Sequence, residues 1–243
     1  MLMFGNEYNI VRHFPEYFLD YREELDSTTR WSDRLQSSSG EWSGNVCDFY
    51  FRVYNKIIKD VKVPFKMSGG ERVDDTPVHK ALREALANCL INADYHGLRG
   101  VVIRKEPDKL VLANPGYIRT GKKQMRIGGE SDPRNKALMK MFNLINIGER
   151  AGSGVPNIFN VWADEGWEEP VIEERFDPDR TILSLEFVEK QAIKTVKNKE
   201  KIREFLIENG LSKTSDIADC LDLSPARTRA ILLEMEDIGK NVK

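Results

Sequence analysis

Cysteine and histidine are scarce in this chain of 243 residues, which contains three of each. The cysteines, Cys47, Cys89 and Cys220, are odd in number and far apart in the sequence. A disulfide framework needs an even set of cysteines in a short secreted chain, and a zinc site needs Cys and His ligands at short spacings. The composition therefore excludes a disulfide scaffold, argues against a zinc site, and fits free thiols in a reducing cytoplasm.

An excess of one charge is also missing, because 37 basic and 39 acidic residues give a net charge of −2. No overall field draws the chain toward nucleic acid, so any DNA contact must come from a local basic patch. Hydrophobic residues make up 40% of the chain and charged residues 31%, which is the composition of a folded globular protein.

No apolar run approaches the roughly 18 residues that a membrane span needs, and no signal-peptide pattern opens the chain. We therefore expect a cytoplasmic protein with no membrane partner. The length fits one large domain or two ordinary ones.

The most informative stretch is 81–95, where apolar residues recur at helical spacing and predict one buried face. Thr76 followed by Pro77 is a typical helix start. A second face carries Glu84, Asn88 and Asn92, which are four residues apart and form one polar ridge. The ridge is either a solvated helix face or a set of groups that faces a phosphate ligand.

The remaining patterns predict an α+β fold. We expect helices over 46–61, 77–96, 135–145 and 155–165, a β-hairpin over 101–113 and a strand over 181–188. Short extended stretches are expected at 1–5 and 14–21, a Ser- and Gly-rich loop at 31–45, and a loop long enough to be mobile at 121–132.

Three loop motifs follow the ridge: Asn114-Pro-Gly116, Arg134-Asn135 and Gly152-Ser153-Gly154 before a helix. Glycines let backbone N–H groups approach an anion, and a helix N-terminus adds partial positive charge. Each motif alone is weak, but their order after a Glu/Asn ridge is uncommon.

This order resembles the GHKL (Bergerat-type) ATP-binding fold. The segments 83–88, 114–116, 133–135 and 148–154 are most similar to a divergent branch of it. That branch is the C-terminal ATP-binding domain of proteins labelled transcriptional regulators or RecG-related ATP-dependent DNA helicases. The resemblance implies a GHKL-like α/β sandwich over 1–190. It also implies that residues 1–30 are the tail of a missing Schlafen-type AlbA-like domain.

The resemblance also implies roles for single residues, with ATP and Mg²⁺ as ligands. Glu84 takes the position of the general base, and Asn88 the position of the amide that binds Mg²⁺ on the phosphates. The residues expected to contact nucleotide are Asn88, Asn92, Asn114, Gly116, Arg134, Asn135, Gly152, Ser153 and Gly154. Asn114 departs from the Asp usual at the adenine position, which removes a charge-assisted hydrogen bond and leaves hydrolysis in question.

The run Gly116–Lys123 is close to a P-loop, but Lys123 stands where a P-loop has the Ser or Thr that binds Mg²⁺. We also expect no helix to begin at its lysines, and the chain is too short for paired helicase motors. The sequence therefore argues against helicase activity.

The C-terminal part predicts a second domain. A charged linker at 191–197 precedes a winged helix-turn-helix domain over 198–243, whose wing is truncated. The residues expected to face DNA at the start of the second helix are Ser224, Arg227, Thr228 and Arg229. Ala226, Ala230 and Leu233 are expected to pack inward. The alternative is a winged helix that mediates protein contacts only.

The sequence thus predicts a DNA-binding transcriptional regulator with an ATP-binding switch domain, in which the 119–132 loop is the moving element. Two alternatives stay open. One is a slow Mg²⁺-dependent ATPase that uses Glu84 as base, and the other is a dimerisation scaffold with an empty pocket, since a homodimer fits this class.

Overall fold

The computed structural model describes residues 1–25, 30–59, 67–68, 71–72, 75–148, 152–210, 212–221 and 223–240. Within this range, the side chains of 67–68, 71–72, 191–194, 196 and 236–240 are not described. The chain forms two compact units, Met1–Phe187 and Val188–Lys243. Each unit has its own hydrophobic core. In the described parts, no helix is long and apolar enough to cross a membrane.

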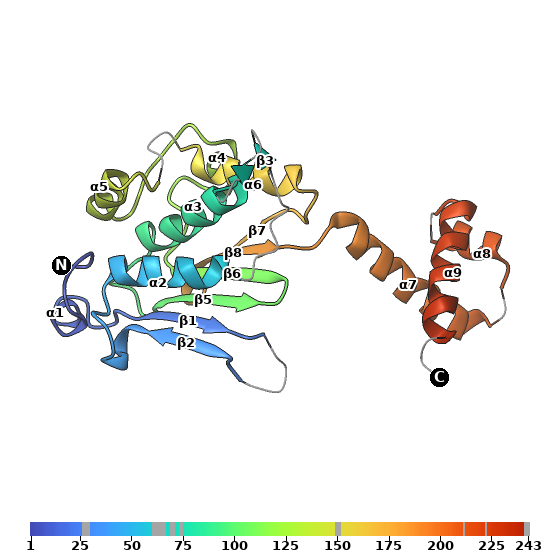
Figure 1. Ribbon diagram of the computed structural model, residues 1–243, viewed down its shortest axis with the longest axis horizontal. Helices are drawn as coiled ribbons and strands as arrows, with labels where there is room; N and C mark the ends of the chain where they lie inside the picture. The colour runs from blue at the N-terminus through green and yellow to red at the C-terminus, as the bar shows by residue number, and fades with distance from the viewer. Residues whose placement is uncertain are drawn as a thin grey trace. The chain divides into compact units, whose positions relative to one another are not determined.

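A six-stranded mixed sheet is the framework of Met1–Phe187 (Figure 1). The strand order is β2-β1-β5-β6-β8-β7; β1 and β5 run parallel and the other neighbours antiparallel. Its strands are β1 (Leu19–Glu23), β2 (Asp33–Gln36), β5 (Val101–Glu106), β6 (Lys109–Pro115), β7 (Val171–Phe176) and β8 (Asp179–Glu186). A separate ribbon pairs β3 (Met67–Ser68) with β4 (Glu71–Arg72).

The predicted α+β class, the hairpin of β5 and β6, and the strand near 181–188 are confirmed. The prediction misses β2, which lies in the segment expected to be a loop, and β7. Both are edge strands, and β2 buries only Leu35 while β7 buries no residue. Neither strand therefore has the apolar alternation that reveals a strand in sequence.

Helices cover one face of the sheet, with α3 packed against α2, α5, α6 and β6 (Figure 1). They are α1 (Glu7–Val11), α2 (Val46–Ile58), α3 (Pro77–Ile91), α4 (Lys122–Ile127), α5 (Lys136–Leu144) and α6 (Gly154–Asp164), with a 3₁₀ turn at Ser37–Ser39. The predicted caps are confirmed: the Asn45 side chain accepts a hydrogen bond from Asp48 N at 2.8 Å, and Thr76 caps α3 with Pro77 in its first turn. Helix α3 ends at Ile91, earlier than expected.

The N-terminal segment contributes to the sheet and the core of Met1–Phe187. Residues 1–25 lie in the same unit as the helices above, and Met3, Ile10 and Leu19 belong to its core. Strand β1 is an internal strand of the sheet and pairs with both β2 and β5. The described part of 1–30 therefore completes the sheet of its own unit, and the AlbA-like domain stays a prediction. The sequence signal is the alternation of apolar Leu19 and Tyr21 with polar Asp20 and Arg22.

The unit Val188–Lys243 contains α7 (Lys190–Asn209), α8 (Thr214–Cys220) and α9 (Pro225–Lys240). Ile202, Ile217 and Ile231, one from each helix, are fully or almost fully buried and form its core. The helices of the predicted helix-turn-helix are present. Residues 191–197, expected to be a linker, lie within α7, and α9 continues to Lys240, where the wing was expected to begin. Residues 241–243 lie outside the described residues, and the wing stays a prediction.

Candidate nucleotide site and helix-turn-helix unit

A cavity of about 150 Å³ lies between α3, the end of β6, the segment that follows β6, and the start of α6. The residues predicted to bind nucleotide that line it are Glu84, Asn88, Asn92, Asn114, Arg134, Gly152 and Gly154. Apolar side chains line another part of the cavity: Leu112, Met139, Ile158, Phe159, Ile172 and Leu183. The cavity therefore combines a polar wall with an apolar wall, as ligand pockets commonly do.

The polar ridge of α3 forms a hydrogen-bonded chain along this wall. Asn88 Nδ2 donates to Glu84 Oε1 at 3.1 Å, and Asn92 Nδ2 donates to the carbonyl oxygen of Asn88 at 3.1 Å. Because the side-chain nitrogen of Asn88 donates to Glu84, the side-chain oxygen Oδ1 of Asn88 is the atom left to face a ligand. The ridge thus faces a cavity instead of bulk solvent.

Glu84 also contacts the first residue of α6. A Cβ atom on Gly154 would overlap Glu84 Oε1 and would lie 2.6 Å from Cδ and 2.8 Å from Cγ. Only glycine allows this approach of α6 to α3. The Glu84 carboxylate therefore lies beside the N-terminus of α6, where the helix dipole favours negative charge.

Asn92 and Asn135 hold the end of α3 in place. Asn92 Oδ1 accepts from Arg134 N at 3.3 Å, so both ends of its amide are engaged within the protein. Asn135 Nδ2 donates to the carbonyl oxygens of Ile91 and Ala93 at 2.9 and 2.7 Å, and Asn135 does not line the cavity. The structure thus places the predicted nucleotide contact Asn135 outside the cavity wall, with its donors at the C-terminus of α3.

Arg134 lies over Gly116 near the end of β6. A Cβ atom on Gly116 would lie 3.0 Å from the Arg134 guanidinium, and Gly116 has φ +96°, which favours glycine. Arg134 donates to Tyr117 O at 3.1 Å, and its guanidinium lies 5.2 Å from the centre of the Tyr117 ring. Gly116 itself does not line the cavity; it gives Arg134 room to reach the cavity wall.

Asn114 is 7% exposed and lies at the end of β6. Its Nδ2 donates to Pro115 O at 3.2 Å and to Asn92 O at 3.5 Å. Both amide donors thus point to backbone carbonyls. The amide donor that Asn has and Asp lacks is therefore turned toward the protein, which leaves Oδ1 as the acceptor.

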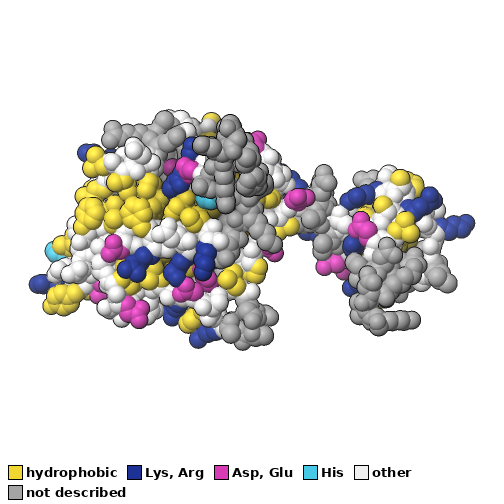
Figure 2. Space-filling model, viewed as in Figure 1, with side chains coloured by type: hydrophobic (Ala, Val, Ile, Leu, Met, Phe, Trp, Pro, Cys, Tyr) yellow, Lys and Arg dark blue, Asp and Glu magenta, His cyan; other side chains and the backbone are white. Residues whose placement is uncertain are grey.

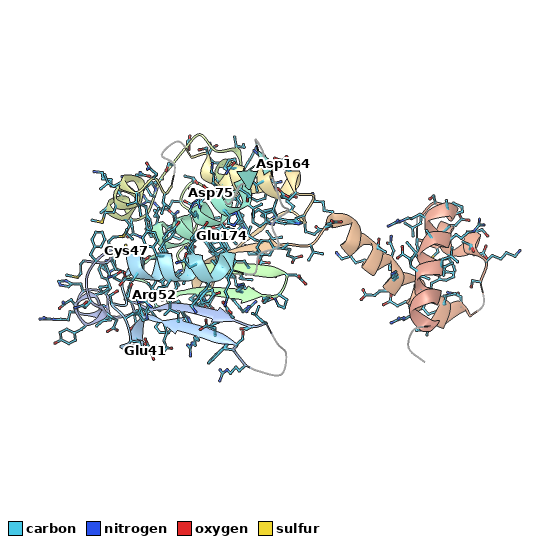
Figure 3. All side chains as sticks on the ribbon, in the orientation of Figure 1. Glu41, Cys47, Arg52, Asp75, Asp164 and Glu174 are labelled. Atoms are coloured by element: carbon cyan, nitrogen blue, oxygen red, sulfur yellow. The ribbon has the colours of Figure 1, made fainter. Side chains whose placement is uncertain are left out.

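The segment from Tyr117 to Pro133 forms one side of the cavity. It contains the six-residue helix α4, so the expected loop at 121–132 is partly helical, and a helix does begin at Lys122. The argument that no helix begins at the lysines is therefore wrong. The other argument against a P-loop, that Lys123 replaces the Ser or Thr, is unaffected. Glu174 on β7 (Figure 3) accepts from Ile118 N at 2.9 Å and holds the start of the segment to the sheet.

The glycine turn before α6 is only partly described. Gly152 has φ +68°, and a Cβ atom there would overlap the carbonyl oxygen of Glu130. Ser153 precedes α6 but does not line the cavity. Residues 149–151 of the motif 148–154 lie outside the described residues. The turn therefore brings Gly152 and Gly154 to the cavity, but not Ser153.

The cavity wall carries three acidic and two basic side chains, a small excess of negative charge. Glu84, Glu130 and Asp132 line it together with Arg119 and Arg134, and Arg119 pairs with Asp132 at 2.9 Å. In the described parts, no group of three or more His, Cys, Asp or Glu side chains could hold a metal ion. The oxygens of Glu84 and Asn88 fit Mg²⁺ only together with ligand phosphates, since Mg²⁺ prefers oxygen donors and keeps several waters.

Several residues of the cavity wall were not predicted, among them Tyr117, Thr181 and Cys89. Burial raises the pKa of the Cys89 thiol to about 12, partly opposed by the charge of Arg180. The thiol is therefore protonated and unreactive at neutral pH. Tyr117 follows the Asn114–Gly116 motif directly, which is the one sequence signal that could have identified it.

The predicted DNA-facing residues divide into two groups. Ser224, Arg227 and Arg229 are exposed at the start of α9. Thr228 is fully buried and donates to the carbonyl oxygen of Ser224 at 3.2 Å, so its prediction as a DNA contact is wrong. Arg227 also donates to Thr195 Oγ1 on α7 at 2.7 Å.

The packing face of α9 was also mispredicted. Ala226 and Ala230 are exposed and Leu233 is 57% exposed, whereas Thr228 and Ile231 are buried. Both sets have helical spacing, so periodicity alone did not separate them. The larger Ile231 fills the core against Ile202 and Ile217, which small alanines would leave unfilled.

Residues 99–182 match the protein-family model described as "Putative ATP-dependent DNA helicase recG C-terminal". The matched segment begins just before β5 and ends in β8, and it covers less than half of the chain. It includes Asn114, Arg134 and the glycines before α6, but not Glu84 or Asn88 on α3. The match supports an ATPase-like, GHKL-like domain of the RecG-related kind in this part of the chain.

No curated protein matches the chain. A solved structure that is similar to it is the crystal structure of the DIP2311 protein from Corynebacterium diphtheriae, with a TM-score of 0.55 and 16% sequence identity. The likeness covers 89% of this chain and 46% of that one, so this chain spans less than half the length of the protein it matches. At this identity the likeness concerns the fold alone.

Proposed function

We propose that Met1–Phe187 binds ATP or a related nucleotide with Mg²⁺ in the cavity, and that Val188–Lys243 binds DNA, so that the chain acts as a nucleotide-responsive DNA-binding regulator. The observation that carries the proposal is the meeting of Glu84, Asn88, Asn114 and Gly154 around one cavity, although they come from three separate elements. The polar wall suits phosphates and the apolar wall suits a base. The ATPase-like family match over 99–182 supports the same ligand class.

Within this proposal, Asn88 holds Mg²⁺ through its amide oxygen, and Gly152 and Gly154 let phosphates approach the start of α6. The bound ion would supply the positive charge that phosphates need and that the slightly acidic cavity wall lacks. The Arg134 guanidinium contributes a further positive charge at the cavity wall. Nucleotide binding is therefore expected to depend on Mg²⁺.

Thermal unfolding with and without Mg²⁺-ATP, Mg²⁺-ADP and a non-hydrolysable analogue tests the nucleotide site. A ligand at about 100 times its Kd adds roughly 2.7 kcal/mol to the stability of the native state. We expect a rise in Tm that Asn88→Ala and chelation of Mg²⁺ both abolish. Asn160→Ala, an exposed asparagine on α6, is the matched control and should keep the rise. No rise at millimolar nucleotide refutes the switch.

The DNA-binding part of the proposal rests on Arg227 and Arg229, which are exposed at the start of the second helix of the pair. Anisotropy of labelled duplex DNA tests it in the full chain. Arg229→Ala should weaken binding and lower the slope of log K against log salt by about 1 if the residue contacts a phosphate. Arg203→Ala on α7, also exposed, should leave binding unchanged. Equal effects of both variants contradict this DNA-binding face.

A slow ATPase is the second candidate, because the Glu84 carboxylate accepts from the Asn88 amide proposed to hold Mg²⁺. A general base beside the metal ligand is positioned to activate water. Glu84→Gln should then abolish turnover and keep nucleotide binding. Turnover that survives this change, or no turnover in the unaltered chain, would refute the hypothesis of a slow ATPase with Glu84 as base.

Homodimerisation stays a prediction. Figure 2 shows apolar side chains gathered over α2 and α5. Phe51 on α2 and Leu144 at the end of α5 are 46% and 82% exposed. Sedimentation of the unaltered chain and of Leu144→Glu would show whether this surface joins two copies.

A further inference from the structure

The face of the sheet opposite the helices carries arginines. Along β1, β5 and β6, Tyr21, Ile103 and Leu112 point toward the helices and are buried. Their neighbours Arg22 and Arg104 point to the other face, where the side chains are 31% and 43% exposed. Since successive residues of a strand alternate between faces, this second face is a continuous surface that solvent reaches.

Three arginines form a row across this face. Arg34 on β2 pairs with Arg22 on β1, and Arg22 pairs with Arg104 on β5. With strands about 4.8 Å apart, the row crosses three strands within about 10 Å. Like charges opposite each other on neighbouring strands are destabilising, so a row of three needs compensation.

Asp20 supplies part of that compensation. Its carboxylate, which is fully buried, accepts from Arg22 Nε at 2.7 Å and from Arg34 Nε at 2.9 Å. One carboxylate therefore serves two guanidinium groups. Each arginine has five N–H donors, so both keep donors for an anion above the sheet.

A second group of arginines lies on the same face at the start of β8. Arg180 pairs with Arg175 across β8 and β7. Burial lowers the pKa of Arg180, Cys89 opposes the shift, and the charges of Arg99, Arg175 and Arg22 lower the pKa further. Arg180 donates to Gly100 O at 2.9 Å, but its Nε is buried without a hydrogen-bond partner, and no ion pair to Arg180 is present in the described parts. Arg175 pairs with Glu173 at 3.5 Å, as Arg104 pairs with Glu106 at 2.7 Å, so Arg180 is the member of this group whose charge no carboxylate in the described parts compensates.

An aromatic ring and apolar side chains accompany the arginines. The guanidinium groups of Arg30 and Arg34 each lie 4.4 Å from the centre of the Trp31 ring. Val102 and Val111 are on the same face and are half-buried. Bases of a single strand stack on aromatic rings and on guanidinium planes, whereas bases of a duplex are paired and stacked inside it.

We propose that this face, the arginine face, formed by Arg22, Arg34, Arg104, Arg175, Arg180 and Trp31, binds single-stranded nucleic acid. The guanidinium groups bind phosphates, and Trp31 with the valines contacts bases. A flat sheet face suits a single strand better than a duplex, because the major groove takes a helix or a two-stranded ribbon. The proposal does not depend on the nucleotide cavity, whose strand residues Leu112, Ile172 and Leu183 lie on the other face of the sheet, or on the helix-turn-helix, which belongs to the other unit.

Anisotropy of a labelled single strand of about 12 nucleotides, within the site sizes of single-strand modules, tests the proposal in the full chain at about 0.1 M salt. The test variant is Arg104→Ala/Arg175→Ala, which removes two arginines of the arginine face and leaves Asp20 with both of its partners. The control variant is Arg12→Ala/Arg52→Ala, which removes two exposed arginines on α2 (Figure 3) and at the end of α1. Both variants change the net charge equally.

We expect the test variant to weaken single-strand binding by about tenfold and the control variant by less than twofold. Trp31 fluorescence should be quenched on binding, and the quenching should disappear in Trp31→Leu. Arg229→Ala should leave single-strand binding unchanged, which separates this result from failure of the DNA-binding proposal above. Equal losses in test and control variants, or no single-strand binding, would overturn the proposal. A test variant that weakens duplex binding as much as single-strand binding would overturn it too.

Discussion

The close approach of Gly154 to Glu84 gives a prediction whose size follows from the structure. In Gly154→Ala, the new methyl group would overlap Glu84 Oε1 and lie 2.6 Å from Cδ. Relieving such overpacking typically costs about 1–3 kcal/mol. Gly154 has a helical backbone at the first position of α6, where Ala is favoured over Gly by about 0.5–1 kcal/mol. Gly154→Ala is therefore expected to lower the unfolding free energy, and this loss comes from the steric overlap, since helix propensity favours the alanine.

A double-mutant cycle with Glu84→Ala measures the steric part. In the Glu84→Ala background, Gly154→Ala should be neutral or stabilising, which gives a coupling energy of about 1–3 kcal/mol. Urea unfolding followed by tryptophan fluorescence is the assay, because all four tryptophans lie in Met1–Phe187 and report on that unit alone. Glu130→Ala, which removes another carboxylate of the cavity wall, is the control partner and should be additive with Gly154→Ala. A coupling below about 0.5 kcal/mol for the Glu84 pair would refute the close contact.

Three further predictions concern stability. Burial raises the pKa of Cys89 to about 12, so between pH 9 and 12 only the unfolded chain ionises this thiol and stability falls, whereas below pH 9 the raised pKa has no effect. By pH 10 the loss of unfolding free energy is about 1.4 kcal/mol, and urea unfolding of Cys89→Ala at pH 8 and 10 should lack this loss. An equal fall in stability with pH in both proteins would contradict the burial of the thiol. Asn135→Ala leaves the carbonyl oxygens of Ile91 and Ala93 without this donor and should lower the unfolding free energy, measured in urea, by about 1–3 kcal/mol. The change Asn157→Ala at an exposed position should lower it by almost nothing, and equal losses would contradict the role of Asn135 at the end of α3. Thr228→Val removes the hydrogen bond to Ser224 O and should speed amide hydrogen exchange in α8 and α9 only; unchanged exchange there would mean that the buried hydroxyl contributes little.

Local features of the fold were predictable from sequence. The caps at Asn45 and Thr76, the α3 ridge and the β5–β6 hairpin depend on residues within a few positions of each other, so spacing and propensity identify them. The edge strands β2 and β7 were not predictable in this way, because their side chains gain little burial. Strand β1 was not recognised as an internal strand, because its partner β5 is far away in the sequence.

The candidate site shows the same division. Spacing placed Glu84 and Asn88 on one helix face, and the structure adds that this face meets a cavity. Residue spacing did not indicate that the Asn135 side chain donates to carbonyl oxygens at the end of α3, or that Thr228 is buried inside the helix-turn-helix unit. Both outcomes depend on which segment packs next to the residue, which sequence separation does not reveal.

The position of β1 has a consequence for how the chain is made. Strand β1 is synthesised before β2 and β5 and can pair first with β2, its antiparallel neighbour close in sequence. Its other edge stays open until β5 has been synthesised, and between them come the buried helices α2 and α3. An open edge is a site for pairing with other chains, so slow synthesis through this region should favour aggregation of nascent protein. A shortened chain that begins after Glu23 would keep the nucleotide cavity residues yet lose an internal strand, and it should be recovered as insoluble protein.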